Sequence, residues 1–289
     1  MRDRILGKRV FSLIDLKDAY HRLLIAPEDP EKMAIQTRFG LFKYVVMPFG
    51  FCNAPGAFQQ LMNRVLGDLY DITVICYLDD ILVFSDTPEQ HVEHLWKVFT
   101  RLREYDLYVN INKCHWAQPE VEFCGHMFSA KGMRISPDKT EIVRNWPLPA
   151  TTRHIRQFLG LCNYFIDYIE HYAEIAAPLS ALQSVKATFI WTLEHHVAFE
   201  ALKRAIISAP VLATFDPDNH IYVYTDASGY ATSGWLGQPH NQQPLPSPLP
   251  KLITEMEALP ALKPVLFFSR KMLPAETRYP VHGQEHLAL

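Results

Sequence analysis

Cysteine is scarce and scattered in this sequence. Its 289 residues include five cysteines, and no two of them form a Cys-x-x-Cys pair. An odd number of scattered thiols is not the pattern of a secreted domain that disulfides stabilise. We therefore expect free thiols and an intracellular, reducing compartment.

Long apolar runs are also absent. The longest, Ile72–Phe84, is interrupted by Asp79 and Asp80, and it is shorter than the roughly 18–20 apolar residues that a membrane helix needs. No apolar segment follows the charged residues of Met1–Gly7, so the sequence predicts neither a signal peptide nor a membrane partner.

Charge of one sign does not dominate, because the formal net charge is only -3. This balance argues against a uniformly basic nucleic-acid-binding protein, although it allows a local basic stripe. An apolar content of 48% with 12% aromatic residues excludes a disordered chain, and the length is sufficient for about two domains.

Three blocks of the chain differ in pattern. Residues 1–115 alternate β-branched segments with amphipathic helices, residues 116–210 are mostly helical, and residues 211–289 begin with a strand at Ile221–Thr225. A proline-rich segment, Gln238–Pro250, predicts a loop in the third block. Together these patterns predict an α+β fold.

One amphipathic helix is expected at about Pro88–Tyr105. Its spacing predicts a buried face with five apolar members. His91 and His94 lack the order of a zinc-binding His-Glu-x-x-His segment, so we expect both to face solvent. The predicted apolar face comprises Val92, Leu95, Trp96, Phe99 and Leu102.

The most informative segment is Ile72–Ser85, in which two apolar β runs flank Tyr77-Leu78-Asp79-Asp80. This pattern predicts a hairpin that presents two adjacent carboxylates at its turn. Placing carboxylates near a core costs free energy unless a cation lies beside them. Ligands that are all oxygen atoms favour magnesium or manganese. An ordinary polar turn is the alternative, because aspartate is common in turns.

Asp15 has a similar context, because it closes the strand-like run Val10–Ile14. If the fold brings Asp15 to Asp79 and Asp80, the three carboxylates could hold two metal ions roughly 3.5–4 Å apart. Such a pair of ions suits in-line displacement at phosphorus, with a 3′-hydroxyl attacking and pyrophosphate leaving.

Three segments resemble motifs of reverse transcriptases, and they occur in the order and spacing of that family. Tyr77–Asp80 resembles the Tyr-x-Asp-Asp box, Phe11–Tyr20 the strand with the first catalytic aspartate, and Met47–Gln59 the segment that lines the nucleotide pocket. The residues of these motifs most closely resemble those of the gypsy class of long-terminal-repeat retrotransposons, and the resemblance covers nearly the whole chain.

The resemblance implies a fragment of a polyprotein with three parts. Residues 1–115 would form the palm, an antiparallel sheet with helices, without the fingers hairpin that precedes it in the family. Residues 116–210 would form the primer grip, the helical thumb and the connection. Residues 211–289 would form the truncated N-terminal part of a ribonuclease H-like domain.

Residue roles in the palm follow from the same resemblance. Asp15, Asp79 and Asp80 would be the catalytic, metal-binding carboxylates. Tyr20 would exclude a 2′-hydroxyl from the nucleotide pocket, although the pattern alone would favour a core aromatic. Phe49 and Gly50 would form the pocket wall. The sequence departs from the family pattern at Phe51 and at Gly56-Ala57, where leucine and alanine-threonine are usual.

A second set of residues is implied to hold the template and primer. Glu122–His126 resembles the primer-grip hairpin, although a zinc site with Cys114-His115 and an ordinary strand pair are alternatives. Ile166-Asp167 stands where the family usually has two arginines. The implied primer-grip residues are Phe123, Cys124, Gly125 and His126. A basic stripe expected to contact phosphates comprises Lys131, Arg134, Lys139, Arg144, Arg153 and Arg156.

Two acidic residues in the third block, Asp226 and Glu285, match metal-binding carboxylates of the ribonuclease H domain by position. The remaining acids would lie beyond Leu289. Two acids alone do not build a two-metal site, so we expect these to be vestigial and expect no ribonuclease H activity.

The resemblance implies an RNA-directed DNA polymerase that extends a DNA primer on an RNA or DNA template. It would use deoxynucleoside triphosphates and two magnesium or manganese ions, in the cytoplasm or in a virus-like particle. An inactive retroelement relic that still folds and binds nucleic acid is the alternative. A nucleotide cyclase of the palm type is a third interpretation, but it needs neither primer grip nor basic thumb.

Overall fold

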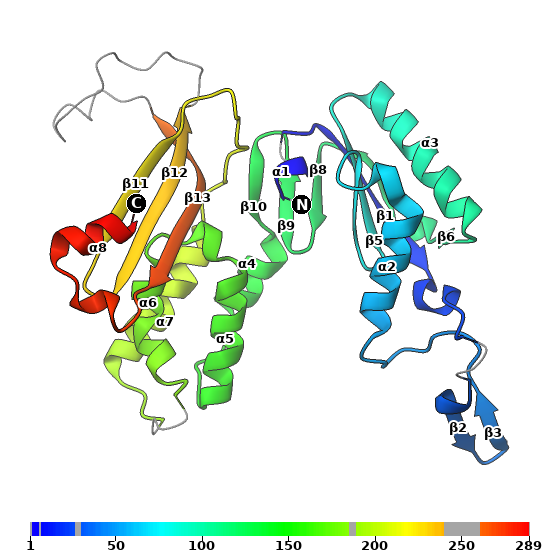
Figure 1. The fold of residues 1–289 in the computed structure, drawn as a ribbon, viewed down its shortest axis with the longest axis horizontal. Helices are drawn as coiled ribbons and strands as arrows, with labels where there is room; N and C mark the ends of the chain where they lie inside the picture. Colours follow the sequence, from blue (N-terminus) through cyan, green and yellow to red (C-terminus); the bar gives the residue numbers. More distant parts are fainter. Residues whose placement is uncertain (1, 6, 27–29, 185–188, 240–260, 289) are drawn as a thin grey trace. The chain divides into compact units, whose positions relative to one another are not determined.

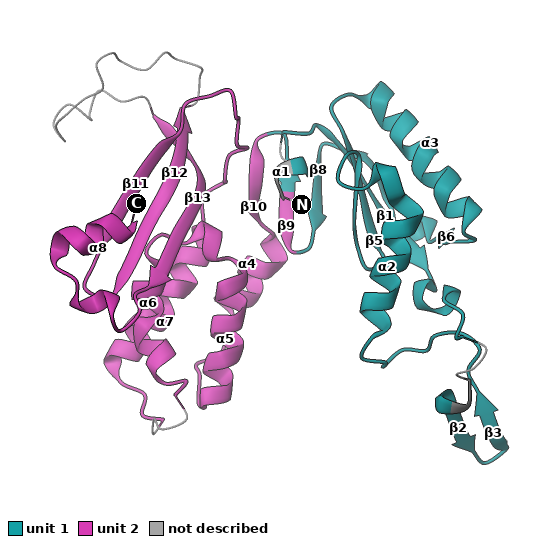
Figure 2. Ribbon diagram, viewed as in Figure 1, with its two compact units in different colours: residues 1–124, 128–130 teal, residues 125–127, 131–289 magenta. Residues whose placement is uncertain are grey.

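The computed structural model describes residues 2–5, 7–26, 30–184, 189–239 and 261–288. The chain forms two compact units, coloured separately in Figure 2: unit 1 is residues 1–124 with 128–130, and unit 2 is residues 125–127 with 131–289. Antiparallel sheets and helices make up both units, so the predicted α+β class is confirmed. No helix among the described residues is long and apolar enough to cross a membrane.

Unit 1 begins with a short helix and then contains most of the strands of the first half of the chain (Figure 1). Its elements are α1 (Arg2–Ile5), β1 (Val10–Lys17), β2 (Ala34–Thr37), β3 (Gly40–Lys43), α2 (Ala54–Leu66), β4 (Val74–Tyr77), β5 (Asp80–Ser85), α3 (Pro88–Glu104), β6 (Tyr108–Val109), β7 (His115–Gln118) and β8 (Glu120–Phe123). The strand expected at Val10–Ile14 and the two β runs expected within Ile72–Ser85 are therefore confirmed.

The main sheet of unit 1 has the order β4-β5-β1-β6, and β7 also pairs with β1. β1 pairs antiparallel with β5 from Val10↔Ser85 to Asp15↔Asp80. The helices α2 and α3 cover this sheet and enclose its core. Buried members of that core include Ile14, Phe58, Met62, Leu66, Val74, Ile81, Val83, Val98 and Leu102. The core therefore anchors β1, which contains Asp15, and β5, which begins at Asp80.

The expected buried face of α3 is only partly correct, because Leu102 is buried and Leu95 packs against the core, but other predicted members are exposed. The helix buries His91, Val98 and Leu102, whereas Val92 and Trp96 are 69% and 76% exposed. The face toward the sheet is therefore rotated from the face that apolar spacing predicted. His91 is 2% exposed, so the expectation that it faces solvent is wrong.

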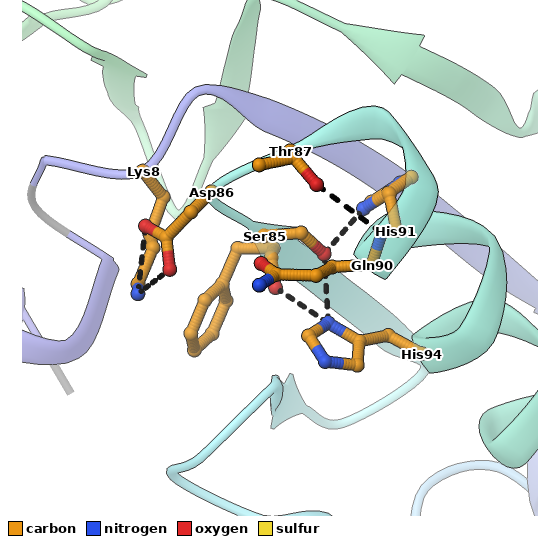
Figure 3. A network of polar contacts seen from close by, with 8 residues as sticks. Lys8, Ser85, Asp86, Thr87, Gln90, His91 and His94 are labelled. Carbon is orange, nitrogen blue, oxygen red and sulfur yellow. Dashed lines mark hydrogen bonds and ion pairs between the residues drawn. The ribbon is translucent and has the colours of Figure 1, made fainter.

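Serine hydroxyls explain how His91 is accommodated in the interior, and Figure 3 shows the contacts made by one of them, Ser85. His91 Nε2 lies 2.7 Å from Ser12 Oγ, and His91 Nδ1 lies 2.8 Å from Ser85 Oγ. Ser85 Oγ is also 2.7 Å from His94 Nδ1. Buried polar groups need such partners, and this chain of hydrogen bonds ties α3 to both β1 and β5. The exposed pair of Lys8 and Asp86 lies next to it.

Unit 2 contains the helical middle of the chain and a further sheet (Figure 1). The strand β9 (His126–Ser129) spans the unit boundary, and β8, β9 and β10 form a small sheet in the order β10-β9-β8. The remaining elements of unit 2 are β10 (Gly132–Ile135), α4 (Pro137–Arg144), α5 (Thr152–Tyr164), α6 (Tyr172–Ala181), α7 (Leu193–Ile207), β11 (Tyr222–Ala227), β12 (Ala231–Pro239), β13 (Leu262–Lys271) and α8 (Val281–Ala288).

Local capping defines the starts of α4 and α5. Ser136 accepts a hydrogen bond from the N–H of Lys139, and Pro137 follows it at the first position of the helix. Thr151 caps α5 by accepting from the N–H of His154. The buried side of α5 consists of Ile155, Phe158, Leu159 and Cys162.

The second sheet of unit 2 has the order β11-β12-β13, with antiparallel pairing throughout. The helix α6 packs against α5, α7 and β13, and α8 packs against β11 and β12. The loop prediction at Gln238–Pro250 is wrong for its first two residues, because Gln238 and Pro239 belong to β12 and pair with β13. The predicted loop from residue 240 on lies outside the described part of the chain.

Candidate active site

Two of the three predicted catalytic carboxylates belong to residues that face each other across paired strands. Asp15 near the end of β1 is the register partner of Asp80 at the start of β5. The carbonyl of Asp79 accepts a hydrogen bond of 3.2 Å from the N–H of Leu16. The fold therefore brings all three aspartates to the same edge of the unit 1 sheet.

The turn before Asp80 has an unusual backbone for its sequence. Tyr77 pairs with Asp80, so Leu78 and Asp79 form a two-residue turn between β4 and β5. Leu78 has φ +57°, a left-handed conformation that costs a residue with a Cβ atom roughly 1–2 kcal/mol. Its surroundings must therefore stabilise it.

Burial and like charges both disfavour the ionised form of Asp80 at this edge. Burial, followed by Asp79 and Asp15, raises the pKa of Asp80, while Lys113 opposes the shift. Lys113 Nζ lies 3.8 Å from Asp15 Oδ2, but its side chain is 66% exposed. The cluster thus has more negative charge than this single solvent-exposed cation neutralises.

The chemistry of the donor set fits magnesium or manganese. Three carboxylates provide oxygen ligands only, which hard divalent cations prefer. Burial and the neighbouring carboxylates of Asp79 and Asp15 raise the pKa of Asp80, and a bound cation would offset both effects. Within the described part of the chain, no three His, Cys, Asp or Glu side chains are already arranged as a complete ligand group. The acids are assembled without a finished coordination shell.

Aromatic rings lie beside the carboxylate edge. The ring of Tyr20 is 5.4 Å from that of Phe49 and 5.2 Å from that of Phe58. Burial raises the pKa of Tyr20, and Asp79 contributes to the shift, which places the phenol within electrostatic reach of the acids. Phe49 is 70% exposed, and Gly50 has φ +98° with open space around its Cα. Tyr20 therefore lies near the acids, and Phe49 packs against the ring of Tyr20.

Three thiols also surround this edge. Cys76 Sγ donates to the carbonyl of Leu78 at 3.0 Å, and Cys114 Sγ accepts from the N–H of Asp15 at 3.4 Å. Burial, with Asp80 and Asp79, raises the pKa of Cys76 to about 12. Burial and Asp80 raise the pKa of Cys124 to about 11. These cysteines are thus protonated, inert thiols at neutral pH.

The predicted primer-grip segment forms a tight turn between β8 and β9. Cys124 has φ +50° and Gly125 φ +77°, the pair of positive values that a type I′ hairpin turn requires. His126 then enters an aromatic cluster: its Nδ1 is 2.9 Å from the hydroxyl of Tyr168, and its ring stacks near Tyr164. The zinc alternative gains no support, because no described residues form such a group.

The predicted basic stripe is distributed over several elements of unit 2. Arg134 lies on β10, and Lys131 directly precedes that strand. Lys139 and Arg144 lie on α4, and the stem of Lys139 runs alongside Gly125. On α5, Arg153 and Arg156 are exposed, and one guanidinium N–H of Arg156 donates to the carbonyl of Gln183.

The two acids of the third block lie on neighbouring elements of unit 2. Asp226 is exposed on β11, and Glu285 is exposed on α8, which packs against β11. They form no metal-binding group with a third acidic, histidine or cysteine side chain among the described residues.

Two residues of the site were not singled out by the sequence. Gln59 hydrogen-bonds the turn between β4 and β5, and Lys113 approaches Asp15. Gln59 stands inside the Met47–Gln59 motif, so its position could have drawn attention. No sequence pattern links Lys113 to Asp15, because their surroundings come together only through the pairing of β1 with β6 and β7, the strands before and after Lys113.

Comparison with known families matches two separate segments of the chain. Residues 2–128 match the family described as reverse transcriptase (RNA-dependent DNA polymerase). Residues 191–249 match the RNase H-like domain found in reverse transcriptase. The first match contains all three aspartates of the sheet edge.

Curated relatives and solved structures agree with this assignment. The Tf2-3 and Tf2-7 transposon polyproteins of Schizosaccharomyces pombe are each 33% identical over 286 residues, which cover 99% of this chain but 20% of each polyprotein. The foamy viral protease-reverse transcriptase dRH in complex with double-stranded DNA superposes with a TM-score of 0.80 at 21% identity, over 99% of this chain and 47% of that one. The same viral protein with an RNA/DNA hybrid gives 0.76 at 22%, over 100% of this chain and 37% of that one.

These structural matches give the chain the fold of a reverse transcriptase. Together with the two family matches and the transposon relatives, they show that the chain belongs to the reverse transcriptase family. The gypsy-class resemblance agrees with the retrotransposon relatives. The chain spans about a fifth of the length of those polyproteins.

Proposed function

We propose that this chain is the polymerase segment of a reverse transcriptase and extends a DNA primer on an RNA or DNA template. The observation that supports this most strongly is the meeting of Asp15, Asp79 and Asp80 at one sheet edge inside the segment that matches the family. The substrates would be deoxynucleoside triphosphates, and the reaction would be nucleotidyl transfer with release of pyrophosphate.

The three aspartates would hold two magnesium or manganese ions. When bound, such ions lower the pKa of an attacking hydroxyl and neutralise charge on phosphate oxygens. The side chains themselves orient this chemistry, because Asp15 and Asp80 are fixed by the β1–β5 ladder and Asp79 by its backbone bond to Leu16. Tyr20 and Phe49 would form the wall against the sugar of the incoming nucleotide.

A template–primer duplex is the proposed partner. The solved relatives were determined with double-stranded DNA and with an RNA/DNA hybrid, and the basic residues of β10, α4 and α5 provide cations suited to phosphates. We further propose the primer-grip role for residues 123–126 and the division into palm (1–115), thumb and connection (116–210) and ribonuclease H-like part (211–289). Phosphate contacts of this kind would weaken steeply with salt.

Primer extension on an RNA template with magnesium or manganese tests the polymerase proposal. Asp79→Asn should abolish extension while leaving the fold and duplex binding intact. Asp106→Asn is the matched control, since Asp106 is an exposed aspartate of the same unit outside the site. Equal extension by the wild type and Asp79→Asn, or no extension by the folded wild type, would contradict the proposal.

A further inference from the structure

The left-handed residue in the carboxylate turn is held from outside the hairpin. Leu78 has φ +57°, and no glycine in Tyr77–Asp80 makes this conformation inexpensive. The N–H of Leu78 donates to Oε1 of Gln59 at 3.0 Å. Gln59 belongs to α2, so the turn depends on a contact between two separate elements.

The same amide also holds the other side of Tyr77. Nε2 of Gln59 donates to the carbonyl of Cys76 at 3.2 Å and to Oδ1 of Asn63 at 3.0 Å. The orientation of the amide is fixed by its partners, because a backbone N–H only donates and a backbone carbonyl only accepts. One side chain therefore bridges the backbone from Cys76 to Leu78.

We propose that Gln59 is a positioning residue for the catalytic carboxylates. By holding Leu78 in its left-handed conformation, it sets the direction in which the chain enters Asp79 and Asp80. Gln59 touches no carboxylate itself, so it acts through the turn. The effect on catalysis rests on the proposed polymerase function, whereas the effect on the turn does not.

The position of α2 extends this role. The helix starts at Ala54, only a few residues after Phe49 and Gly50, and Gln59 lies on its second turn. Phe58, the residue before Gln59, packs on the ring of Tyr20. One helix thus contacts both the aromatic pocket and the carboxylate turn, and Gln59 is its link to the acids.

Hydrogen exchange of the Leu78 amide tests the turn without any need for activity. Gln59→Met removes both polar atoms at nearly constant length, and Gln60→Met is the matched control on the exposed side of α2. We expect exchange at Leu78 to be at least about 10-fold faster in Gln59→Met and unchanged in Gln60→Met. Equal exchange in the wild type and Gln59→Met would overturn the proposal.

A second variant keeps the test decisive if Gln59→Met fails to fold. Gln59→Glu retains an oxygen for the N–H of Leu78 but loses the donor to Cys76, so Leu78 should stay protected. Rapid exchange of Leu78 in a folded Gln59→Glu variant would show that the side-chain oxygen does not hold the turn, and the proposal would be wrong.

Primer extension then measures the catalytic consequence. A turn that is no longer held should lower kcat about 10- to 100-fold, since small misplacements of reacting groups cost rates of this size, while the KM for nucleotide and the Kd for duplex change less than about twofold. Adding Leu78→Gly to Gln59→Met should restore part of kcat, because glycine adopts positive φ without strain.

Unchanged kcat in Gln59→Met would overturn the positioning role. Absence of extension by the wild type would instead refute the polymerase function, and exchange would still decide whether Gln59 holds the turn.

Discussion

Asp15 and Asp80 are register partners in the antiparallel pair of β1 and β5. Burial raises the pKa of Asp80, and repulsion by the carboxylates of Asp79 and Asp15 adds to the shift. The acidic cluster therefore lowers the stability of the metal-free protein and attracts cations.

Asp80→Asn should raise the melting temperature of the metal-free protein at neutral pH. A carboxyl whose pKa is higher in the folded than in the unfolded state stabilises the fold at low pH and loses that contribution as pH rises through the folded pKa. Replacing it with a neutral amide removes this loss. Magnesium should then raise the melting temperature of the wild type more than that of the variant.

Differential scanning calorimetry with and without magnesium checks this expectation. Asp106→Asn serves as the control, because Asp106 is exposed and lies outside the acidic cluster. A lower melting temperature for metal-free Asp80→Asn than for the wild type would contradict the destabilising effect of the buried Asp80 carboxylate.

The stability of unit 1 should fall as pH drops below about 6.5. Burial lowers the pKa of His91, and His94 adds to the shift, so the unfolded chain binds a proton there more readily than the folded chain. The partners of His91 are the hydroxyls of Ser12 and Ser85, and neither neutralises an imidazolium. The stability contributed by neutral His91 is therefore complete above pH 6.5 and declines in acid.

Urea unfolding at pH 7.5 and pH 5.5 measures this dependence. His91→Gln should be less stable at pH 7.5 but should show a smaller difference between the two pH values than the wild type. His115→Gln, at an exposed histidine of β7, should retain the wild-type difference. An unchanged pH dependence in His91→Gln would refute the assignment to His91.

Gly132→Ala should destabilise unit 2 by at least about 1 kcal/mol. Gly132 has φ +130°, and a Cβ atom there would lie 2.1 Å from the carbonyl oxygen of Leu212, which accepts from the N–H of Met133. Gly160→Ala is the opposite case, because that glycine lies inside α5 with open space around it. It should stabilise the helix by roughly 0.5–1 kcal/mol. Chemical denaturation of both variants should give opposite signs, and equal signs would contradict this explanation.

Cys52 should be the first thiol that iodoacetamide modifies in the native protein at pH 7.5. It is exposed, whereas Cys76 and Cys162 are buried. Burial raises the pKa of each of these two thiols to about 12, and the thiolate is the reactive form. Mass spectrometry of digested, labelled protein gives the order of modification. Cys52→Ser should remove the fast phase of thiol modification. Labelling of Cys76 or Cys162 before Cys52 would contradict this order.

Local elements of this fold were predictable because short stretches of sequence contain their causes. The apolar run up to Asp15 gives β1, the acidic interruption of Ile72–Ser85 gives the hairpin turn, and Ser136-Pro137 gives the start of α4. Each depends on backbone propensity, capping or alternation within a few neighbouring residues.

The orientation of α3 was not predictable in the same way. Its periodicity allowed Val92 and Trp96 as core residues, but the hydroxyls of Ser12 and Ser85 satisfy His91 and turn that face inward. A helix pattern records which residues share a face, whereas the partner surface decides which face is buried.

The sequence by itself determined the order of the motifs and the residue types of the site, which are acids beside strand-forming runs and aromatic residues in the neighbouring motifs. Only the tertiary structure decided that Asp15 stands opposite Asp80, that Lys113 approaches Asp15, and that Gln59 holds Leu78. The physical reason is that strand register and side-chain hydrogen bonds depend on groups far apart along the chain, which meet only after the core between α2, α3 and the sheet has packed.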